Sequence, residues 1–554
     1  MADQSPRFTF LGKLISTALI GGLIYFGYGM LTGKPVTIPG FPSSGSPTTT
    51  DAAEVSEAQA TVPVLAPPAA FQLKVDSVVP IEISEYAGYA GLIVANGGLE
   101  PGPNSLFTKY CGCRVKLTIS EEESWSSLNS GKLAGSVTTT DVLAVYGRQF
   151  KVKVPAQIGF SRGADGLLVR TDVRRVNALR GKVIAAAQFT ETDFLIRYLA
   201  QEAGLGISML GSLDAEPSPS GLNLVYTEDG FAAGDLLLAD VKSGKNRLAG
   251  AVTWEPKTSE VVAQSGGAVR LLTSNKNLLI IADVLVLNQG FAEAHPKLVE
   301  GLVRALLEGN RMVRDNPEPY LTTIATAFKW SPDQARAELV KVHLSNLPEN
   351  LAFFGGEIDA AGSFGGIFQS AVYAYGSELI HDPADPGSFV DLTALQAADK
   401  AGWFKGQTIA IAPIRSGGAS SVETDPLLSK DIRFLFQPNS ATLDLAQTEN
   451  LKNLEAIKQL LTVSPGSTVL LRGHVDNAMV EEFRKKGGDA YVRQMALRAV
   501  ELSRNRAAEI QKLLVQKHGV DAKRVDIVGR GWDEPAGADA DQNRRVEVQW
   551  FTLE

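Results

Sequence analysis

The sequence predicts a multidomain α/β protein that begins with a transmembrane helix. Its 554 residues are too many for one hydrophobic core, because single cores stop growing at roughly 250–300 residues. From residue 71 onward, short apolar runs typical of strands alternate with amphipathic runs typical of helices. This alternation predicts mostly parallel sheets with helices on their faces. An uncharged apolar stretch near the N-terminus adds the membrane segment.

The apolar stretch at residues 14–31, LISTALIGGLIYFGYGML, contains no charged side chain. At about 1.5 Å per residue it extends about 27 Å, close to the hydrocarbon thickness of one bilayer. Arg7 and Lys13 precede it, so the positive-inside rule places residues 1–13 in the cytoplasm. A cleaved signal peptide is the alternative, but no convincing small-x-small cleavage site follows the stretch. The sequence therefore predicts a transmembrane signal-anchor at residues 14–33.

Two segments have the composition of linkers. Residues 34–70 are rich in Pro, Ser, Thr and Ala and contain a single aromatic residue, Phe41. Such a segment buries too little apolar surface to offset the entropy lost on ordering, so a linker is expected. A second linker at residues 407–427 separates a middle domain, residues 71–406, from a C-terminal domain, residues 428–554.

The two cysteines, Cys111 and Cys113, flank one glycine. In an oxidising compartment they can form a disulfide, although the geometry across one residue is tight. Two inert thiols and a redox-active pair are the alternatives. No further ligands stand nearby in the sequence, so a metal site is not expected.

Polar loops follow several predicted strands of the middle domain. They are SEYAGY at 84–89, TTTD at 138–141, AQFTET at 187–192 and TWEP at 253–256. Ligands of α/β proteins bind beyond the carboxyl ends of the strands. These four loops are therefore expected to surround a binding site.

The order of motifs in the middle domain resembles that of the periplasmic solute-binding proteins of nitrate, sulfonate and taurine ABC importers. The shared motifs are GKLAG, TTTD, GADGLLV, LRGKVIA and WEP, in that order between residues 131 and 256. The resemblance implies two α/β lobes around a hinged cleft, with one lobe built from both ends of the segment. It also implies a small-molecule solute and an ABC permease or another envelope complex as partners.

Carried over to this chain, the resemblance places the ligand-binding residues on the polar loops. They are Tyr86, Gly88 and Tyr89 on the first loop, Thr139 and Asp141 on the second, Thr190 and Thr192 at a helix N-terminus, and Trp254 with Glu255 on the facing lobe. Each polar residue can instead be a turn former or a helix cap. Trp254 can equally be part of the core.

The charges near these loops bear on the nature of the solute. A helix N-terminus favours anions, which suits nitrate or a sulfonate. However, Glu191 and Asp193 flank that terminus, and Asp165 lies on a neighbouring loop. This excess of carboxylates favours a neutral or amine-bearing solute, or a cleft that has lost its transport function.

The sequence favours a binding protein over an enzyme. Thiamine-pyrimidine synthases share the binding-protein architecture but use a cleft histidine, and all five histidines here lie outside the cleft motifs. The motifs HExxH and GK[ST] do not occur. We therefore expect no catalytic residue, cofactor or metal. The net charge of −8 gives no support to nucleic-acid binding.

The C-terminal domain has the pattern of a small β-α-β-α-β-β unit. The predicted strands are DIRFLF at 431–436, STVLLRGHV at 467–475, RVDIVGRG at 524–531 and RRVEVQWF at 544–551. Apolar residues at helical spacing predict the helices between them. Five motifs, FLFQPNSATL, GHVDN, LSRNRA, GRGWDEP and NRRVE, are similar to the peptidoglycan-binding domain of outer-membrane protein A (OmpA).

This second resemblance implies non-covalent binding to the diaminopimelate of peptidoglycan. Asp476 would pair the ammonium, Arg506 would hold the carboxylate through its planar fork, and Arg545 would brace the site. Two family positions differ, because Val475 replaces a threonine and Ala499 replaces an asparagine. An insertion at residues 478–492 also lengthens the path from Asp476 to Arg506. The alternative is a structural domain without wall contact.

Taken together, these features predict a single-pass protein of the bacterial inner membrane with most of its chain in the periplasm. It would bind a small solute in a two-lobed cleft and attach to peptidoglycan. The alternative is a wall-attached scaffold whose middle domain binds a partner protein and no solute.

Overall fold

The computed structural model describes residues 54–551 apart from 75–77, 121–123, 277, 357–361, 412–425, 438–439, 465 and 538–539. The predicted cytoplasmic segment 1–13 and signal-anchor 14–33 lie outside the described residues, as does most of the second linker. Within the described ranges, no helix is both long enough and apolar enough to cross a membrane.

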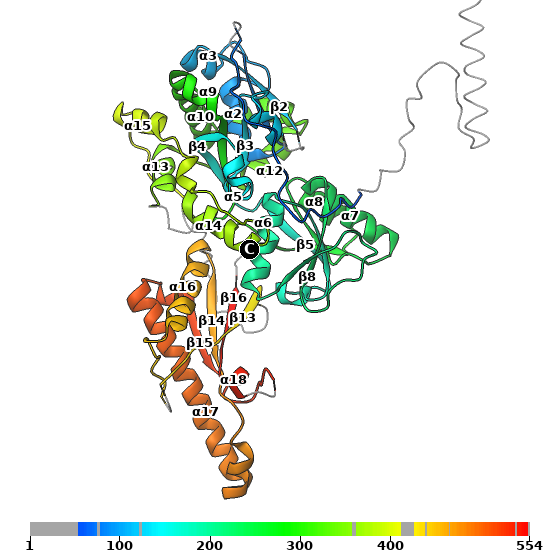
Figure 1. Ribbon diagram of the computed structural model, residues 1–554, viewed down its shortest axis with the longest axis vertical. Coiled ribbons are helices and arrows are strands. Elements are labelled where there is room, and N and C mark those ends of the chain that lie inside the picture. The colour runs from blue at the N-terminus through cyan, green and yellow to red at the C-terminus, as the bar shows by residue number, and fades with distance from the viewer. Residues whose placement is uncertain are drawn as a thin grey trace, which may run out of the picture. The chain divides into compact units, whose positions relative to one another are not determined.

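The first lobe of the middle domain contains a six-stranded mixed sheet in the order β12-β4-β11-β3-β1-β2. Strands β2, β3 and β4 of this sheet are labelled in Figure 1. Its strands are β1 (Val78–Ile83), β2 (Arg114–Ile119), β3 (Gly135–Thr139), β4 (Val152–Ser161), β11 (Ala282–Asn288) and β12 (Val342–Leu344). Strands β2, β1 and β3 run parallel, whereas β11 is antiparallel to both β3 and β4. The sheet is therefore formed by residues from both ends of the middle domain.

Helices cover this sheet, and their bounds follow the chain in two groups. Before the second lobe come η1 (Ala87–Tyr89), α2 (Ala90–Asn96), α3 (Leu106–Cys111), α4 (Trp125–Asn129), α5 (Thr140–Tyr146) and η2 (Gly147–Gln149). After it come α9 (Gln289–Ala294), α10 (Pro296–Asp315), η4 (Glu318–Tyr320), α11 (Leu321–Phe328), α12 (Pro332–Leu339), α13 (Leu347–Gly355), α14 (Phe364–Tyr375), η5 (Pro386–Ser388) and α15 (Thr393–Lys400).

Helix α10 illustrates how the sequence specifies this packing. Pro296 occupies its first turn, where the missing N–H costs nothing, and the apolar residues at helical spacing that follow are buried. Gly309 faces helix α2, where an added Cβ would approach the carbonyl oxygen of Gly91 to 2.1 Å. Only glycine at this position permits the two helices to pack so closely.

The second lobe contains another six-stranded sheet, in the order β10-β5-β9-β6-β8-β7. Its elements are β5 (Asp165–Arg170), η3 (Val176–Leu179), β6 (Val183–Ala187), α6 (Glu191–Glu202), β7 (Ile207–Met209), β8 (Leu222–Thr227), α7 (Gly230–Ser243), β9 (Gly250–Trp254), α8 (Lys257–Gln264) and β10 (Val269–Ser274). The chain enters this lobe after Ser161 and leaves it after Ser274. The expected two-lobed α/β arrangement, with one lobe built from both ends of the segment, is confirmed.

Residues 54–70 contain no helix or strand, as their linker composition predicts, but they follow the surface of the middle domain. Their hydrogen bonds join Ser56 to Tyr226, Gln59 to Gln188, Leu65 to Gln149, and Ala66 to Ser126 and Asn129. Part of the predicted linker is therefore held by hydrogen bonds to both lobes, most of them to side chains. Composition does not reveal such a contact, because it depends on polar partners far away in the sequence.

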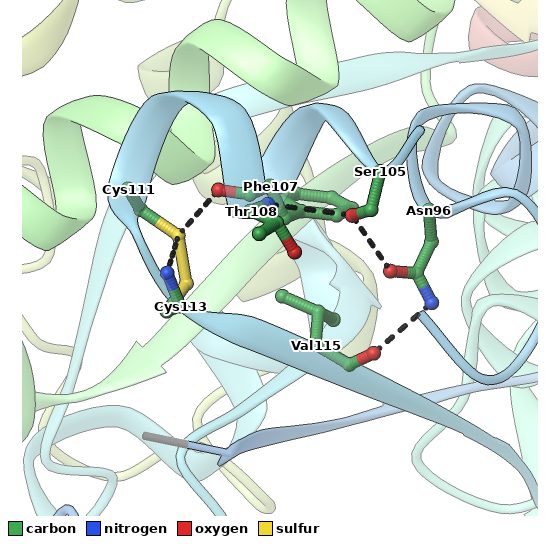
Figure 2. Close-up of a disulfide and its surroundings, with 7 residues drawn as sticks. All are labelled: Asn96, Ser105, Phe107, Thr108, Cys111, Cys113 and Val115. Atoms are coloured by element: carbon green, nitrogen blue, oxygen red, sulfur yellow. Dashed lines mark hydrogen bonds between the residues drawn. A yellow bond between two sulfur atoms is a disulfide. The ribbon is translucent and has the colours of Figure 1, made fainter. Parts of the chain in front are cut away.

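Cys111 and Cys113 form a disulfide, which is one of the three alternatives left open by the sequence (Figure 2). Cys111 ends α3 and Cys113 directly precedes β2, with the two Cα atoms 5.2 Å apart. The N–H of Thr108 donates to the capping hydroxyl of Ser105 at the start of α3. Gly112 ends the helix at φ +65°, a conformation that glycine adopts without steric cost. The bridge thus fixes the turn from α3 into β2.

The C-terminal domain contains a four-stranded sheet in the order β13-β16-β14-β15. Its elements are β13 (Leu428–Ile432), α16 (Thr448–Val463), β14 (Thr468–Gly473), α17 (Val480–His518), η6 (Ala522–Arg524), β15 (Val525–Gly529), α18 (Ala540–Asn543) and β16 (Val546–Phe551). The predicted β-α-β-α-β-β order is confirmed, with the short α18 before the last strand. The first strand begins and ends earlier than predicted, because Phe434 leaves the sheet and enters the core.

Candidate functional site

A cavity lies between the two lobes, where parallel strands β1 and β3 of the first lobe and β6, β8 and β9 of the second end. Its volume is about 100 Å³, which is room for several water molecules or one small solute. It is lined by Glu82, Ile83, Ser84, Tyr86, Tyr89, Ser120, Trp125, Ser136, Val137, Thr138, Thr139, Ser161, Asp165, Thr190, Glu191, Glu228, Asp229, Gly230, Trp254, Ile281 and Asp283. The cavity therefore has walls from both lobes.

Five of the nine residues predicted for the cleft line this cavity. They are Tyr86, Tyr89, Thr139, Thr190 and Trp254. The polar loops at the strand ends are therefore brought together, as the parallel-sheet argument requires.

The other four predicted residues lie outside the cavity. Gly88 packs beneath Tyr86, and an added Cβ would approach that ring to 2.2 Å. The Thr192 hydroxyl accepts a hydrogen bond from the N–H of Ala187 at 3.1 Å and also contacts the hydroxyl of Thr190. These two residues shape the loops that carry the cavity residues.

Asp141 and Glu255 also lie outside the cavity lining. Asp141 is fully buried in the first turn of α5. Glu255 of the second lobe accepts two hydrogen bonds from Ser259 and forms an ion pair of 2.7 Å with Lys341 of the first lobe. Glu255 thus joins the two lobes beside the cavity.

Two tyrosines and a buried carboxyl group form one wall of the cavity. The rings of Tyr86 and Tyr89 meet edge to face, with centroids 5.2 Å apart. The Tyr89 hydroxyl donates a hydrogen bond of 2.9 Å to Oδ1 of Asp283. The other oxygen of Asp283, Oδ2, is buried and has no hydrogen-bond partner. This wall therefore presents an unpaired acceptor.

Trp254 forms the opposite wall together with Phe231, whose ring centroid lies 4.9 Å away. Gly230 lies directly against the indole, because an added Cβ would approach it to 2.2 Å. The indole Nε1 is buried without a hydrogen-bond partner. Trp254 packs on its neighbours and also faces the cavity. The sequence left open whether this residue belongs to the core or to the binding site, and its position is compatible with both.

The lining is acidic. Its carboxylates are Glu82, Asp165, Glu191, Glu228, Asp229 and Asp283, and it includes no Lys, Arg, His or Cys. Burial raises the pKa of Asp165 to about 6, although hydrogen bonds from Ser161 and Asn275 oppose the change. Burial also raises the pKa of Asp283 well above its ordinary value, and the charges of Asp165 and Asp141 raise it further. A positive charge beside these carboxyl groups would lower their pKa values.

Sequence reasoning found the loops but missed Asp283, Glu82, Glu228 and Asp229. Asp283 carried a usable signal, since it is the one charged residue within the apolar run LLIIADVLVLN. A carboxylate inside a buried strand is costly unless it has a partner or a function. The other three follow or interrupt strands without a distinctive motif.

In the C-terminal domain, Asp476 and Arg506 lie near one another without a direct ion pair. Asp476 follows β14, accepts a hydrogen bond from the N–H of Ala478, and has Oδ2 at 3.6 Å from Nε of Arg544. Arg506 on α17 lies over the Phe436 ring at 5.0 Å and donates to the carbonyl of Ser440 at 3.3 Å.

The charges around Arg506 identify a basic residue that sequence reasoning missed. Burial and the charge of Arg544 lower the pKa of Arg506, whereas Asp476 raises it. Arg545, by contrast, contacts Asp431 at 3.1 Å and the carbonyl of Glu534. Arg544 is therefore the residue of the NRRVE motif that approaches Asp476.

The predicted insertion forms the first part of α17, which is interrupted at Gly487 and Gly488. Phe483 of this segment packs against Tyr491 and against Trp532, with ring centroids 5.9 and 6.1 Å apart. The insertion is thus attached to the GRGWDEP loop of the family motif.

One group of potential metal ligands occurs among the described residues: His474, Glu534 and Glu547. Arg472 already forms ion pairs of 2.6 Å with Glu534 and 2.5 Å with Glu547. A metal ion would have to displace this guanidinium. The ion pairs with Arg472 therefore explain why the two carboxylates lie close together.

Residues 435–549 match the model of the OmpA family. No curated protein matches this chain. Several solved structures are similar to it at low identity. The alkanesulfonate-binding protein SsuA from Xanthomonas axonopodis pv. citri bound to MOPS is 14% identical, with 58% of this chain and 99% of that chain covered and a TM-score of 0.42. The periplasmic nitrate-binding protein NrtA from Synechocystis PCC 6803 is 14% identical, with 59% and 89% covered and a TM-score of 0.43.

Proposed function

We propose that this chain is a protein of the bacterial cell envelope that binds a small solute between its two lobes and attaches to peptidoglycan through residues 428–554. Residues 14–33 would tether it to the inner membrane, with the bulk of the chain in the periplasm. The observation that carries this proposal is a cavity with walls from both lobes in a chain whose C-terminal domain matches the OmpA family.

Solute binding is supported by the polar groups that the cavity leaves without partners. Asp283 Oδ2, the Thr138 hydroxyl and Nε1 of Trp254 are buried and make no hydrogen bond. Buried polar groups are nearly always paired in folded proteins. A bound solute would supply the missing partners, and hinge closure at the two crossings between the lobes would enclose it. An ABC permease or another envelope complex would then receive the solute.

Peptidoglycan binding is supported by the retained charges of the C-terminal domain. Asp476 would pair the ammonium of diaminopimelate, and Arg506 would hold its carboxylate. Arg544 lies 3.6 Å from Asp476 and adds a second positive charge near Arg506 for the carboxylate. Val475 and Ala499 are buried, so the two departures from the family pattern remove polar contacts beside the site without removing its charges.

Co-sedimentation of the full chain with purified peptidoglycan tests the wall contact. We expect the wild-type chain to sediment and the Asp476→Ala and Arg506→Ala variants to remain in solution, because a zwitterion needs both charges met. The double variant should be little worse than either single variant, since both residues act on one ligand. Free diaminopimelate should compete, whereas lysine, which lacks the second carboxylate, should not.

The Arg545→Ala variant is the matched control in this experiment, because Arg545 faces Asp431 and the Glu534 carbonyl. It should sediment more than the Asp476 and Arg506 variants. A wild-type chain that stays in solution at low salt would leave only the alternative of a structural domain without wall contact.

Solute binding is tested separately by the melting temperature of the full chain with amines, sulfonates, nitrate and neutral compounds. A ligand that binds only the folded state raises its stability. A panel in which no compound changes the melting temperature would favour the scaffold, whose middle domain binds a partner protein.

A further inference from the structure

The charge of the cavity limits the class of solute that it can hold. Two of its six carboxylates, Glu82 and Asp283, come from the first lobe, and the other four come from the second. No basic side chain is among the lining residues to compensate them. A nitrate or sulfonate would face this negative potential from both sides, which costs free energy at short range. A cation with charges near both lobes would be attracted.

Asp283 provides an observation that is independent of the acidic composition. Its side chain is 3% exposed, its Oδ1 accepts a hydrogen bond from Tyr89, and its Oδ2 has no partner. The residue borders the cavity, so the missing donor can come from the cavity contents. An ammonium group fits, because it supplies both N–H donors and a positive charge.

Aromatic rings complete the environment that an alkylammonium compound requires. Tyr86, Tyr89, Trp125 and Trp254 line the cavity. Their faces attract cations and their apolar surfaces pack against methylene groups. A bare metal ion uses neither property. Among the described residues, the carboxylates that lie close enough together to chelate one ion belong to the C-terminal domain.

We propose that the cavity binds an aliphatic diamine or polyamine, with one ammonium group at Asp283 of the first lobe and another at the carboxylates of the second lobe. This inference rests on the solute-binding function proposed above and names its ligand class. The methylene chain would lie against the tyrosines on one side and Trp254 on the other.

The proposal also accounts for the protonation of the site. The titratable groups that face Asp283 are Tyr86 and Tyr89 at η1, Asp165 on β5 and Asp141 on α5. An ammonium group among them favours the ionised carboxylates and therefore displaces protons. Alkylamines keep their own proton up to about pH 10. Binding should strengthen between pH 6 and pH 8, with protons released to the buffer.

Isothermal titration calorimetry of the full chain at pH 8 tests the ligand class. Putrescine and spermidine should bind at least tenfold more tightly than two control compounds. Butylamine carries only one charge, and the bis(trimethylammonium) derivative of putrescine keeps both charges but has no N–H donor. The measured binding enthalpy of putrescine and spermidine should change with the ionisation enthalpy of the buffer, because the buffer takes up the released protons. Magnesium ions, calcium ions, taurine and nitrate should each bind more weakly than putrescine and spermidine.

The Asp283→Asn variant tests the assigned residue. Asparagine keeps an oxygen for the Tyr89 hydroxyl but removes the charge, so putrescine should bind at least tenfold more weakly while the melting temperature of the free protein stays equal or rises. Asp235→Asn is the matched control, because Asp235 lies on α7 with a half-exposed side chain and is paired with Lys257. It changes the net charge equally and should leave the affinity unchanged.

The outcomes separate this inference from the function on which it rests. If taurine, nitrate or a neutral compound binds and the amines do not, solute binding stands and the cationic ligand is wrong. If a divalent cation alone binds as tightly as putrescine, or if Asp283→Asn binds putrescine like the wild type, the proposal is overturned. If no amine gives heat with the wild-type chain, it is equally overturned.

Discussion

At the scale of single residues, Asp141 is where burial and charge conflict most clearly. Burial raises its pKa to about 7, and the charges of Asp165 and Asp193 act in the same direction. Both oxygens of Asp141 are buried without a hydrogen-bond partner, as is the neighbouring Thr139 hydroxyl. The carboxyl group therefore stabilises the folded protein only while it holds its proton. Its contribution is fully present below about pH 4 and is lost as the pH rises through about 7.

This conflict predicts that Asp141→Asn stabilises the protein at high pH. The amide keeps the shape of the side chain and removes the cost of ionisation, so the free energy of unfolding at pH 8 should rise by about 1–3 kcal/mol. At pH 4 the two proteins should be alike. Melting temperatures across this range provide the measurement. A variant that is less stable than the wild type at pH 8 would show that the ionised carboxylate has a favourable partner.

Residue roles were the part of the site that sequence reasoning predicted least well. Tyr86, Tyr89, Thr139, Thr190 and Trp254 were expected to line the cleft and do line the cavity. Asp141 lies only two residues after Thr139 and is also polar, yet in the first turn of α5 its side chain is buried in the interior. Which way a polar side chain points depends on packing between elements, and no local pattern encodes that.

At the scale of elements, the disulfide ties the end of α3 to the start of β2. It closes a loop of only three residues, so removing it frees little conformational entropy in the unfolded chain. The residues it joins, Cys111 and Cys113, are absent from the cavity lining. A structural role and a redox role therefore predict different consequences of its removal.

We expect the Cys111→Ser, Cys113→Ser double variant to lose about 1–2 kcal/mol of stability and to bind solute like the wild type. Treatment of the wild-type chain with a reductant should reproduce the same decrease in melting temperature. Calorimetry with the solute, with and without reductant, checks the second part. A loss of affinity on reduction would instead identify the cysteine pair as a redox control on binding.

Elements were predicted well where a periodic pattern decides them. The strands and helices of both lobes follow the alternation seen in the sequence, and the C-terminal β-α-β-α-β-β order is present. The path of residues 54–70 could not be predicted, because their attachment depends on side chains such as Gln149 and Gln188 that approach only in the folded protein. The early end of β13 had a similar cause, since Phe434 is drawn into the core.

At the scale of the whole molecule, the proposed function combines attachment of the C-terminal domain to peptidoglycan with closure of the two lobes of the middle domain. The chain passes between the lobes at Ser161 to Asp165 and at Ser274 to Ala282, and residues 54–66 are also hydrogen-bonded to both lobes. The first crossing is itself part of the cavity, because Ser161 and Asp165 line it. Asp165 also accepts hydrogen bonds from Ser161 and from Asn275, which lies at the second crossing. A positive charge that binds at Asp165 therefore acts directly on the segment about which the lobes would rotate.

The central claim is that the two lobes close on a solute, and a distance between them tests it most directly. Spin labels at Glu100→Cys in the first lobe and Lys245→Cys in the second can be attached selectively, because both native cysteines are in the disulfide. Both positions are exposed. A label pair at Glu216→Cys and Lys245→Cys, within the second lobe, is the control.

Pulsed electron paramagnetic resonance of the doubly labelled full chain then gives the distance distribution between the lobes with and without saturating putrescine. We predict a shorter and narrower distribution with the amine, while the control pair within the second lobe is unchanged, because closure is a rigid-body movement of one lobe toward the other. An inter-lobe distribution that is the same with and without the amine would contradict the account.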